Sequence, residues 1–316
     1  MKKACDLYSG LGGTTAGALR AGVEVIWCAN HNDHAVACHR ANHPDVPCVQ
    51  QDLAEMDWAS APRAEIMLAT PACQDFSQCG QPAAAGTGGN GHVDVSAMIA
   101  KRQRDRNTTW AVLAACDSMR PERFLIENVP DLLRWELYPA WFQVLKAMGY
   151  KLREHRLNAH DYGSPQDRER VIITGSLHSE IVLAPKLDVP RLSIGDCIDW
   201  GDNGRWTEID SKSQRMRVRM RKAQRGAGSQ CFWNNVSEAR GRSFDEAFPT
   251  STTRSSGQWN ILDGDRARTI SARELARSMS FPDSYQLPKS KDIAGRLIGN
   301  AIDVRFAAGV IAQIVN

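Results

Sequence analysis

The stretch Ala4 to Thr15, ACDLYSGLGGTT, decides the fold prediction. Ala4 to Tyr8 is typical of a short first strand, a glycine-rich turn follows at once, and Ala16 to Ala21 continues as a helix. This order opens the doubly wound α/β folds that bind nucleotides, because glycines let the backbone approach a ligand and a helix amino end favours polar or anionic groups. Tight turns also need glycine for their own geometry, so this stretch alone is weak evidence for a nucleotide site.

Short apolar runs and helical segments continue to alternate after this opening. Strands are expected at residues 23–29, 46–49, 66–69, 124–126, 150–157 and 171–174, with helices at 33–42, 141–148, 268–277 and 304–314, another beginning near Asn107, and a glycine turn at Gly299. The pattern predicts a doubly wound, Rossmann-like α/β fold. Residues 176–258 lose the alternation and are polar and basic, which indicates a second, smaller domain.

The composition is that of a globular protein, with 42% hydrophobic and 24% charged residues in a chain of 316. We expect no membrane partner and a cytoplasmic location, because no apolar run has membrane-spanning length and Asp6 lies where a signal peptide needs apolar residues. The nine cysteines include no Cys-x-x-Cys pair, which is typical of reduced thiols rather than a disulfide framework.

Cysteine and histidine side chains crowd one early segment and raise the question of a metal ion. They are Cys28, His31, His34, Cys38, His39, His43 and Cys48. Their spacings match no standard zinc pattern, so we expect ordinary core and surface roles for them and no metal.

Cys73 follows the apolar run at 66–69, at the carboxyl end of a predicted parallel strand. Ligands and reacting groups collect at such strand ends in open α/β sheets. A reactive thiol needs partial exposure and an electropositive setting, whereas most free cysteines are small buried apolar groups. This stretch alone leaves both interpretations open.

A second ionisable group, Glu127, ends the predicted strand at 124–126, which we expect to neighbour the Cys73 strand. A partly buried carboxyl group at that position could donate a proton near neutral pH, although an acid at a helix start is the plainer explanation. Arg168 and Arg170 alternate in an extended segment, so both should point to one face and together suit a phosphate or a carboxylate.

The middle of the chain carries a dense basic run without an acid. Its members are Lys212, Arg215, Arg217, Arg219, Arg221, Lys222 and Arg225. Such a run is usually a solvated face, but it also suits a phosphate backbone.

In chain order, these residues resemble the motifs of the DNA methyltransferases that act on carbon 5 of cytosine. The matching stretches are Asp6 to Gly13, Pro71 to Ser77, Glu127 to Val129, Gln166 to Arg170, Arg268 to Pro282 and Gly299 to Ile302. Tyr8 stands where the family has Phe, Ala72 where it has a Pro before the nucleophile, and His31 or its neighbours where it uses a Glu for the ribose.

The resemblance implies a catalytic and cofactor-binding domain at 1–178, a target-recognition domain at 179–260 and a C-terminal segment at 261–316 that returns to the first domain. It implies S-adenosylmethionine as cofactor and double-stranded DNA as substrate, with the cytosine flipped out of the helix. The implied catalytic residues are Cys73 as nucleophile, Glu127 at the ring nitrogen, Arg168 at the base carbonyl and Arg170 beside it.

Two further groups of residues follow from the resemblance. The cofactor-binding residues are expected to be Tyr8, Ser9, Gly10, Leu11, Gly12, Gly13, His31, Asp52, Pro71, Asn300 and Ala301. Asp52 could equally be a helix cap. The DNA-binding residues are expected to be Gln74, Ser77, Arg104, Arg106, Arg215, Arg217, Arg219 and Arg221.

Three alternative functions share part of this pattern. A transfer-RNA methyltransferase of the same family would share the core motifs, although the basic middle segment favours duplex DNA. An inactive DNA-binding relative would lack Cys73, Glu127 or Arg168, and all three are present. An oxidoreductase is disfavoured by the full motif series and the missing ribose acid. We expect a monomer, with a cognate restriction endonuclease as a possible partner.

Overall fold

The computed structural model describes residues 1–72, 95–201, 204–235, 240–253 and 257–315, and the backbone alone within 95–106. Its main sheet has seven strands in the order β3-β2-β1-β4-β5-β8-β6. They are β1 (Lys3–Leu7), β2 (Glu24–Asn30), β3 (Cys48–Gln50), β4 (Ile66–Ala69), β5 (Arg123–Asn128), β6 (Lys151–Asn158) and β8 (Glu169–Ser176). The first five are parallel, and β8 runs antiparallel to both of its neighbours.

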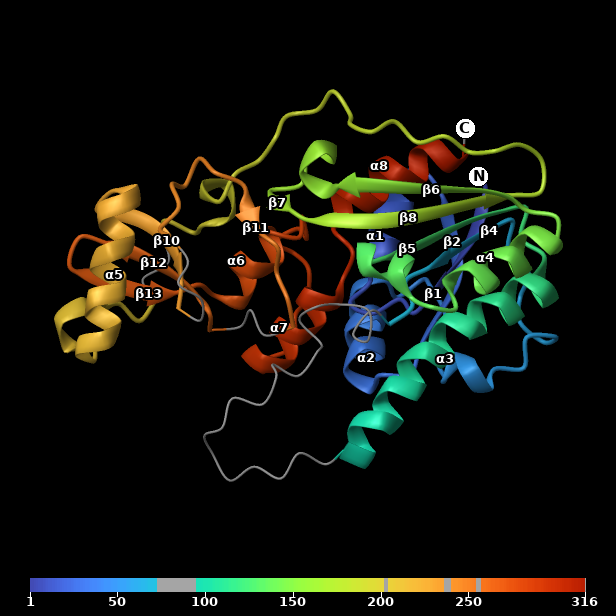
Figure 1. The fold of residues 1–316 in the computed structure, drawn as a ribbon, viewed down its shortest axis with the longest axis horizontal. Helices are drawn as coiled ribbons and strands as arrows, with labels where there is room; N and C mark the ends of the chain where they lie inside the picture. Colours follow the sequence, from blue (N-terminus) through green and yellow to red (C-terminus); the bar gives the residue numbers. More distant parts are fainter. Residues whose placement is uncertain (73–94, 202–203, 236–239, 254–256, 316) are drawn as a thin grey trace.

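Helices cover both faces of this sheet (Figure 1). On one face, α3 (Val95–Met119) and α4 (Tyr138–Ala147) bury Val112, Trp141 and Leu145 against the strands. On the other, α1 (Gly13–Arg20), α2 (Asp33–Asn42) and α8 (Val304–Val315) bury Ala18, Val36 and Phe306. The predicted doubly wound α/β fold is confirmed, and β4 and β5 are neighbours as expected.

A second, four-stranded sheet has the order β10-β12-β13-β9. Its strands are β9 (Thr207–Glu208), β10 (Gln230–Asn234), β12 (Trp259–Asp263) and β13 (Arg266–Thr269). Helix α5 (Gln214–Ala227) packs Met220 and Ala223 on this sheet. The boundary predicted at residue 260 falls inside β12, and the sheet continues to Thr269.

The helix predicted at 268–277 is shorter in the structure, because its first residues pair with β12 as part of β13. The helix itself, α6, spans Ala272–Arg277 and begins at a capping box in which Ser271 and Glu274 each bond the other's backbone. The turn predicted at Gly299 is likewise the last turn of α7 (Lys291–Asn300).

A third apolar cluster joins the two sheets, with α6, α7 and a short parallel pair of strands, β7 (Gln166–Asp167) and β11 (Phe248–Pro249), between them (Figure 1). It contains Leu11 of the glycine-rich turn, Phe248, Trp259 and Ile298. The turn at the start of the chain is therefore packed against segments from its far end.

The segment Lys291–Val315 is long and apolar enough to cross a membrane by length and composition alone, and its most apolar 18-residue window has a mean hydropathy of 1.4. The structure divides it into α7 and α8, and 61% of its most apolar window is buried inside the protein. Phe306, Val310 and Ile314 of α8 pack against the main sheet, and each is at most 1% exposed. It is thus a pair of core helices in this fold.

Candidate active site

The carboxyl ends of β1, β4 and β5 meet at one edge of the main sheet. Beyond β4, the Thr70 amide donates to the Leu7 carbonyl at 3.1 Å, and the Thr70 hydroxyl donates to the Tyr8 carbonyl at 3.1 Å. These bonds fix the start of the Cys73 segment against the glycine-rich turn.

Two further bonds position the residues just before Cys73. The Asn128 side-chain amide donates to the Pro71 carbonyl at 3.3 Å, and the Ala72 amide donates to the Thr108 hydroxyl at 3.2 Å. The Tyr8 hydroxyl, which the family's Phe would lack, donates to the Thr108 carbonyl at 2.6 Å. Cys73, Gln74 and Ser77 themselves lie outside the described residues.

Glu127 is the next-to-last residue of β5 and forms an ion pair with Arg170 of β8, Nε to Oε1 at 2.9 Å. Both side chains are only 10% exposed. The antiparallel register, in which Asn128 faces Val171, brings the two strands together at this point. A charge-assisted hydrogen bond between a buried carboxylate and a buried guanidinium restricts the orientation of both side chains.

Arg168 has different partners from those expected. Its guanidinium donates to the carbonyl oxygens of Ser251, Gly299 and Ala301 at 2.8–3.1 Å. It also donates to the Gln166 side chain, whose oxygen accepts the Ser251 amide. The expectation that Arg168 and Arg170 share one target is therefore wrong, because Arg168 ties the end of α7 to the segment after β11 while Arg170 pairs with Glu127.

The glycine-rich turn is held by a residue that sequence reasoning missed. The Tyr285 hydroxyl donates to the Leu11 carbonyl at 2.6 Å, and His43 Nε2 lies 3.0 Å from the Tyr285 hydroxyl oxygen. Gly12 has a φ of 96°, and a Cβ there would lie 2.4 Å from the Tyr285 oxygen. Gly13 likewise has no room for a side chain, since its Cβ would lie 2.3 Å from the Ile302 carbonyl oxygen.

The structure brings the other cofactor candidates to the same edge. His31 is exposed directly after β2, and Asp52 follows β3 and caps a short helix by accepting the Ala54 amide at 3.0 Å. The cap that sequence reasoning left open for Asp52 is therefore formed. Asn300 and Ala301 end α7, beside the contact between Gly13 and Ile302.

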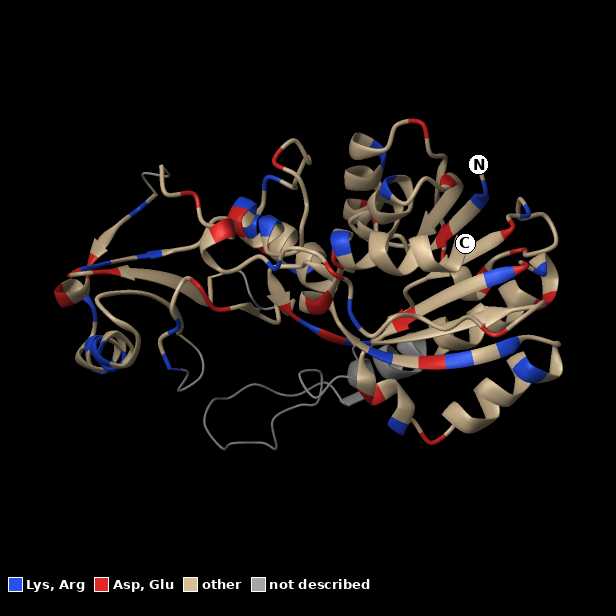
Figure 2. Ribbon diagram, turned by 90° about the horizontal axis from the view of Figure 1, so that it is seen from above, with Lys and Arg blue, Asp and Glu red and all other residues tan. Residues whose placement is uncertain are grey.

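All of the basic run except Lys212 lies in α5, at the end of the molecule far from the main sheet (Figure 2). Arg221 is bound by Asp265 at 2.7 Å, and Arg219 donates to the Asn235 carbonyl and lies over the Trp233 ring. Arg215 is exposed, as are Lys222 and Arg225 about two and three helical turns further on, while Arg217 is half-buried. Which of these basic side chains are exposed depends on the helical period of α5, and the charge pattern of the sequence alone did not predict it.

A pocket of about 250 Å³ lies between α5 and the second sheet. Its polar lining includes Arg205, Lys212, Asn235, Asn260 and Thr269. Arg104 and Arg106 belong to α3, in the part where only the backbone is described.

Comparison with known families decides the identity. The family model for C-5 cytosine-specific DNA methylases matches residues 2–316. The chain belongs to this family. It is a methyltransferase enzyme, and it is 27% identical to the Type II methyltransferase M.NlaX of Neisseria lactamica, over 99% of this chain and 96% of that protein. It is also 25% identical to M.NgoBI of Neisseria gonorrhoeae, over 96% and 90%.

Solved structures support the fold of this methylase. A DNA modification methyltransferase encoded within an E. coli prophage superimposes with a TM-score of 0.71 at 20% identity, covering 100% of this chain and 99% of the other. The S. pombe Dnmt2 methyltransferase gives 0.67 at 18% identity, covering 99% and 98%.

Proposed function

We propose that the methylase transfers a methyl group to carbon 5 of a cytosine in duplex DNA through a covalent bond between Cys73 and carbon 6. The observation that carries this proposal is the buried Glu127–Arg170 pair, because it lies at the end of β5 beside the strand that leads to Cys73. Asn128, the residue after Glu127, bonds the Pro71 carbonyl and so links the carboxylate strand to the nucleophile segment.

Carbon 5 of cytosine is a poor nucleophile until a group adds at carbon 6. In the proposed step the Cys73 thiolate forms the bond to carbon 6, and the electron pair of the ring double bond becomes available at carbon 5. After carbon 5 is methylated, a base removes its proton, the double bond re-forms, and Cys73 leaves as a thiolate. The bonds that fix Thr70, Pro71 and Ala72 orient the chain for this attack.

Glu127 is assigned to ring nitrogen 3 of the flipped cytosine, where it prevents negative charge from building up on the ring. Arg170 holds the Glu127 carboxylate through Nε and is assigned to the base carbonyl through Nη2, because its Nη1 donates to the Glu169 carbonyl at 2.7 Å. We therefore assign the contact with the base carbonyl to Arg170, in place of Arg168. Arg168 is assigned a positioning role at the joint between the domains.

The glycine-rich turn fits S-adenosylmethionine, which would supply the methyl group as an electrophile. A Cβ built on Gly10, whose φ is 52°, would have a single described neighbour within 4 Å, the Tyr8 carbonyl oxygen at 3.7 Å. This leaves space for a ligand beside the backbone. Tyr8, Ser9 and Asp52 would line that space, with His31 at the end of β2 and Asn300 and Ala301 from α7, while the Leu11 side chain is buried in the third apolar cluster.

The DNA surface is assigned to α5 and the pocket beside it. Exposed Arg215 and Lys222 would contact phosphates and position the duplex, while Arg205 and Lys212 at the pocket carry donors that can read base edges. Because the relatives are named Type II methyltransferases, we also propose a role in restriction-modification, with a cognate endonuclease in the same cytoplasm and the methylase itself a monomer.

The test is transfer of labelled methyl from S-adenosylmethionine to unmodified duplex DNA, with wild type and Cys73→Ala side by side and bisulfite sequencing of the product. Label at cytosine with wild type alone is the expected result. Label on transfer RNA and none on DNA would show that the substrate is RNA. Full activity of Cys73→Ala would remove Cys73 from the mechanism.

A further inference from the structure

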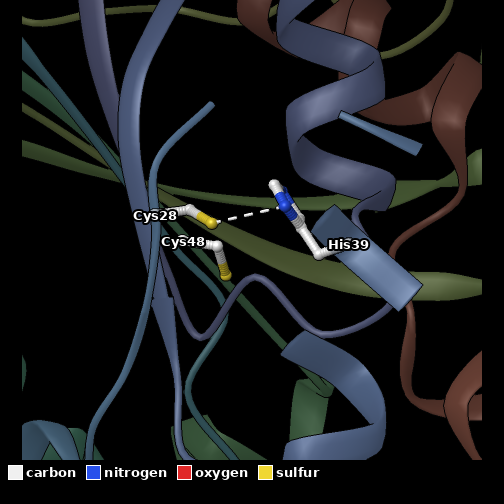
Figure 3. A group of neighbouring side chains, drawn as sticks. All are labelled: Cys28, His39 and Cys48. Atoms are coloured by element: carbon white, nitrogen blue, oxygen red, sulfur yellow. Dashed lines mark hydrogen bonds between the residues drawn. The ribbon is translucent and has the colours of Figure 1, made fainter. Parts of the chain in front are cut away.

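Three side chains outside the proposed active site meet in the core beneath α2. Cys28 of β2, Cys48 of β3 and His39 of α2 are buried, and their sulfur and nitrogen atoms all lie within 4.8 Å of one another (Figure 3). Their spacing in sequence matches no zinc motif, because two of them come from neighbouring strands and the third from the helix that joins those strands.

The strand register explains how the sulfurs meet. Cys28 is paired with Cys48 across β2 and β3, and Asp6 of β1 is paired with Cys28 on the other side. Residues paired directly across parallel strands point to the same face of the sheet. Asp6, Cys28 and Cys48 therefore form a row on one face of the main sheet, and the His39 side chain of α2 contacts this row.

The contacts around His39 indicate which of its ring nitrogens carries the hydrogen. The Thr15 hydroxyl donates its one hydrogen to Asp6 Oδ2 at 2.7 Å, so its oxygen can only accept from His39 Nε2, which lies 3.0 Å away. His39 Nδ1 then carries a lone pair, and it lies 3.5 Å from the Cys28 sulfur. An imidazole with one N–H held by a hydroxyl–carboxylate relay and the other nitrogen free to bind is the usual setting of a metal-binding histidine.

The distances suit a tetrahedral ion. Zinc binds sulfur at about 2.3 Å and nitrogen at about 2.0–2.1 Å, which places two such ligands about 3.6 Å apart. The Cys28–His39 separation of 3.5 Å already meets this value, and no ligand atom is more than 4.8 Å from another. Small side-chain movements would complete the geometry.

The surrounding charge also favours a cation. Asp6 is 0% exposed, and its Oδ1 has no hydrogen-bond partner in the described part of the chain. A buried carboxylate oxygen without a partner is unfavourable, and a cation next to the row would offset that cost. We propose that Cys28, His39 and Cys48 bind one zinc ion, with Asp6 and Thr15 orienting the histidine. The ion would pin β2, β3 and α2 together.

The experiment uses the full chain in a Cys73→Ala, Cys79→Ala background, which removes two thiols outside the described residues. The protein is reduced, stripped with a chelator and titrated with Co²⁺. One equivalent should give thiolate-to-cobalt charge-transfer absorption and the intense visible bands of a tetrahedral site, and Zn²⁺ should abolish both. Absence of these bands in the folded protein would overturn the proposal.

Variants locate the ion. Cys48→Ser should lose the charge-transfer band, whereas Cys231→Ser, which removes a buried thiol of the second sheet, should keep it. Thr15→Val leaves all three ligands in place but removes the relay, and should weaken zinc affinity about 10–100-fold. Circular dichroism establishes that each variant is folded. If Cys48→Ser does not fold, Thr15→Val decides: affinity equal to that of the parent protein would contradict the site.

Discussion

Glu127 Oε1 lies 2.9 Å from Arg170 Nε across β5 and β8, and neither side chain is more than 10% exposed. Arg168, two residues earlier, has its guanidinium in a separate set of bonds to backbone carbonyl oxygens. Two arginines of one motif thus differ in what their loss should do. Arg170 holds the carboxylate that is proposed to act on the base, and Arg168 holds the segments that join the two sheets.

Arg170→Lys should lower kcat for methyl transfer by roughly 100-fold with little change in Tm, because an ammonium group cannot keep the planar contact that orients Glu127. Arg168→Lys should instead lower the unfolding free energy by about 2 kcal/mol or more, since buried carbonyl oxygens lose their donors. Single-turnover assays and urea unfolding on both variants separate the two. The assignment fails if Arg168→Lys loses kcat at unchanged stability while Arg170→Lys stays fully active.

Gly12→Ala should abolish tight cofactor binding. Its φ of 96° disfavours a side chain, and the added Cβ would lie 2.4 Å from the Tyr285 hydroxyl that holds Leu11 in place. Gly22→Ala is the matched control, because Gly22 also has a positive φ, 74°, but has open space around it. It should cost about 1 kcal/mol and leave binding intact. Calorimetric titration with S-adenosylmethionine on both variants tests this, and equal losses would mean that backbone strain alone is responsible.

These two predictions also mark what the sequence could reveal. Local periodicity located Asp33–Asn42 and Ile66–Ala69 with their observed bounds, and two apolar runs sufficed to predict that the strand of Glu127 neighbours the strand that precedes Cys73. The partners of Arg168 could not be predicted, since Gly299 and Ala301 are 131 and 133 residues away and offer only backbone carbonyls. Every residue has a backbone carbonyl, so the sequence does not indicate which carbonyls an arginine will bind. The Cys28–His39–Cys48 cluster was hidden for a related reason, because it exists only once the register of β2 and β3 is known.

Glu274 should make the joint between the sheets sensitive to acid. Burial acts to raise the pKa of this carboxyl group, but the Arg268 guanidinium at 2.7 and 2.9 Å and the Ser271 and Asp199 amides outweigh it, and the net pKa is lowered. A lowered pKa means stability that is present above the ordinary value of about 4.3 and is lost as pH falls through the folded-state value.

Glu274→Gln should therefore cost about 3–5 kcal/mol at pH 7, because it leaves Arg268 buried without a carboxylate, and the difference from wild type should shrink in acid. Urea unfolding at several pH values measures this. Asp283→Asn is the control, since its partnership with Arg277 is largely exposed and should contribute at most about 1 kcal/mol. A pH-independent loss in Glu274→Gln would show that packing, not charge, sets its effect.

Duplex DNA binding should depend on salt through the exposed face of α5. Arg215 and Lys222 are exposed, so replacing either with Ala should reduce the slope of log affinity against log salt by about 0.9, the contribution of one phosphate contact. Arg221→Ala should change the slope much less, because Asp265 already binds that guanidinium at 2.7 Å. Lys151→Ala, which removes an exposed charge at the start of β6 in the main sheet, controls for net charge.

Fluorescence anisotropy at increasing salt concentrations gives the slopes. If Arg221→Ala lowers the slope as much as Arg215→Ala, the ion pair with Asp265 opens on DNA binding; if Lys151→Ala does so too, α5 is not the phosphate-contacting face.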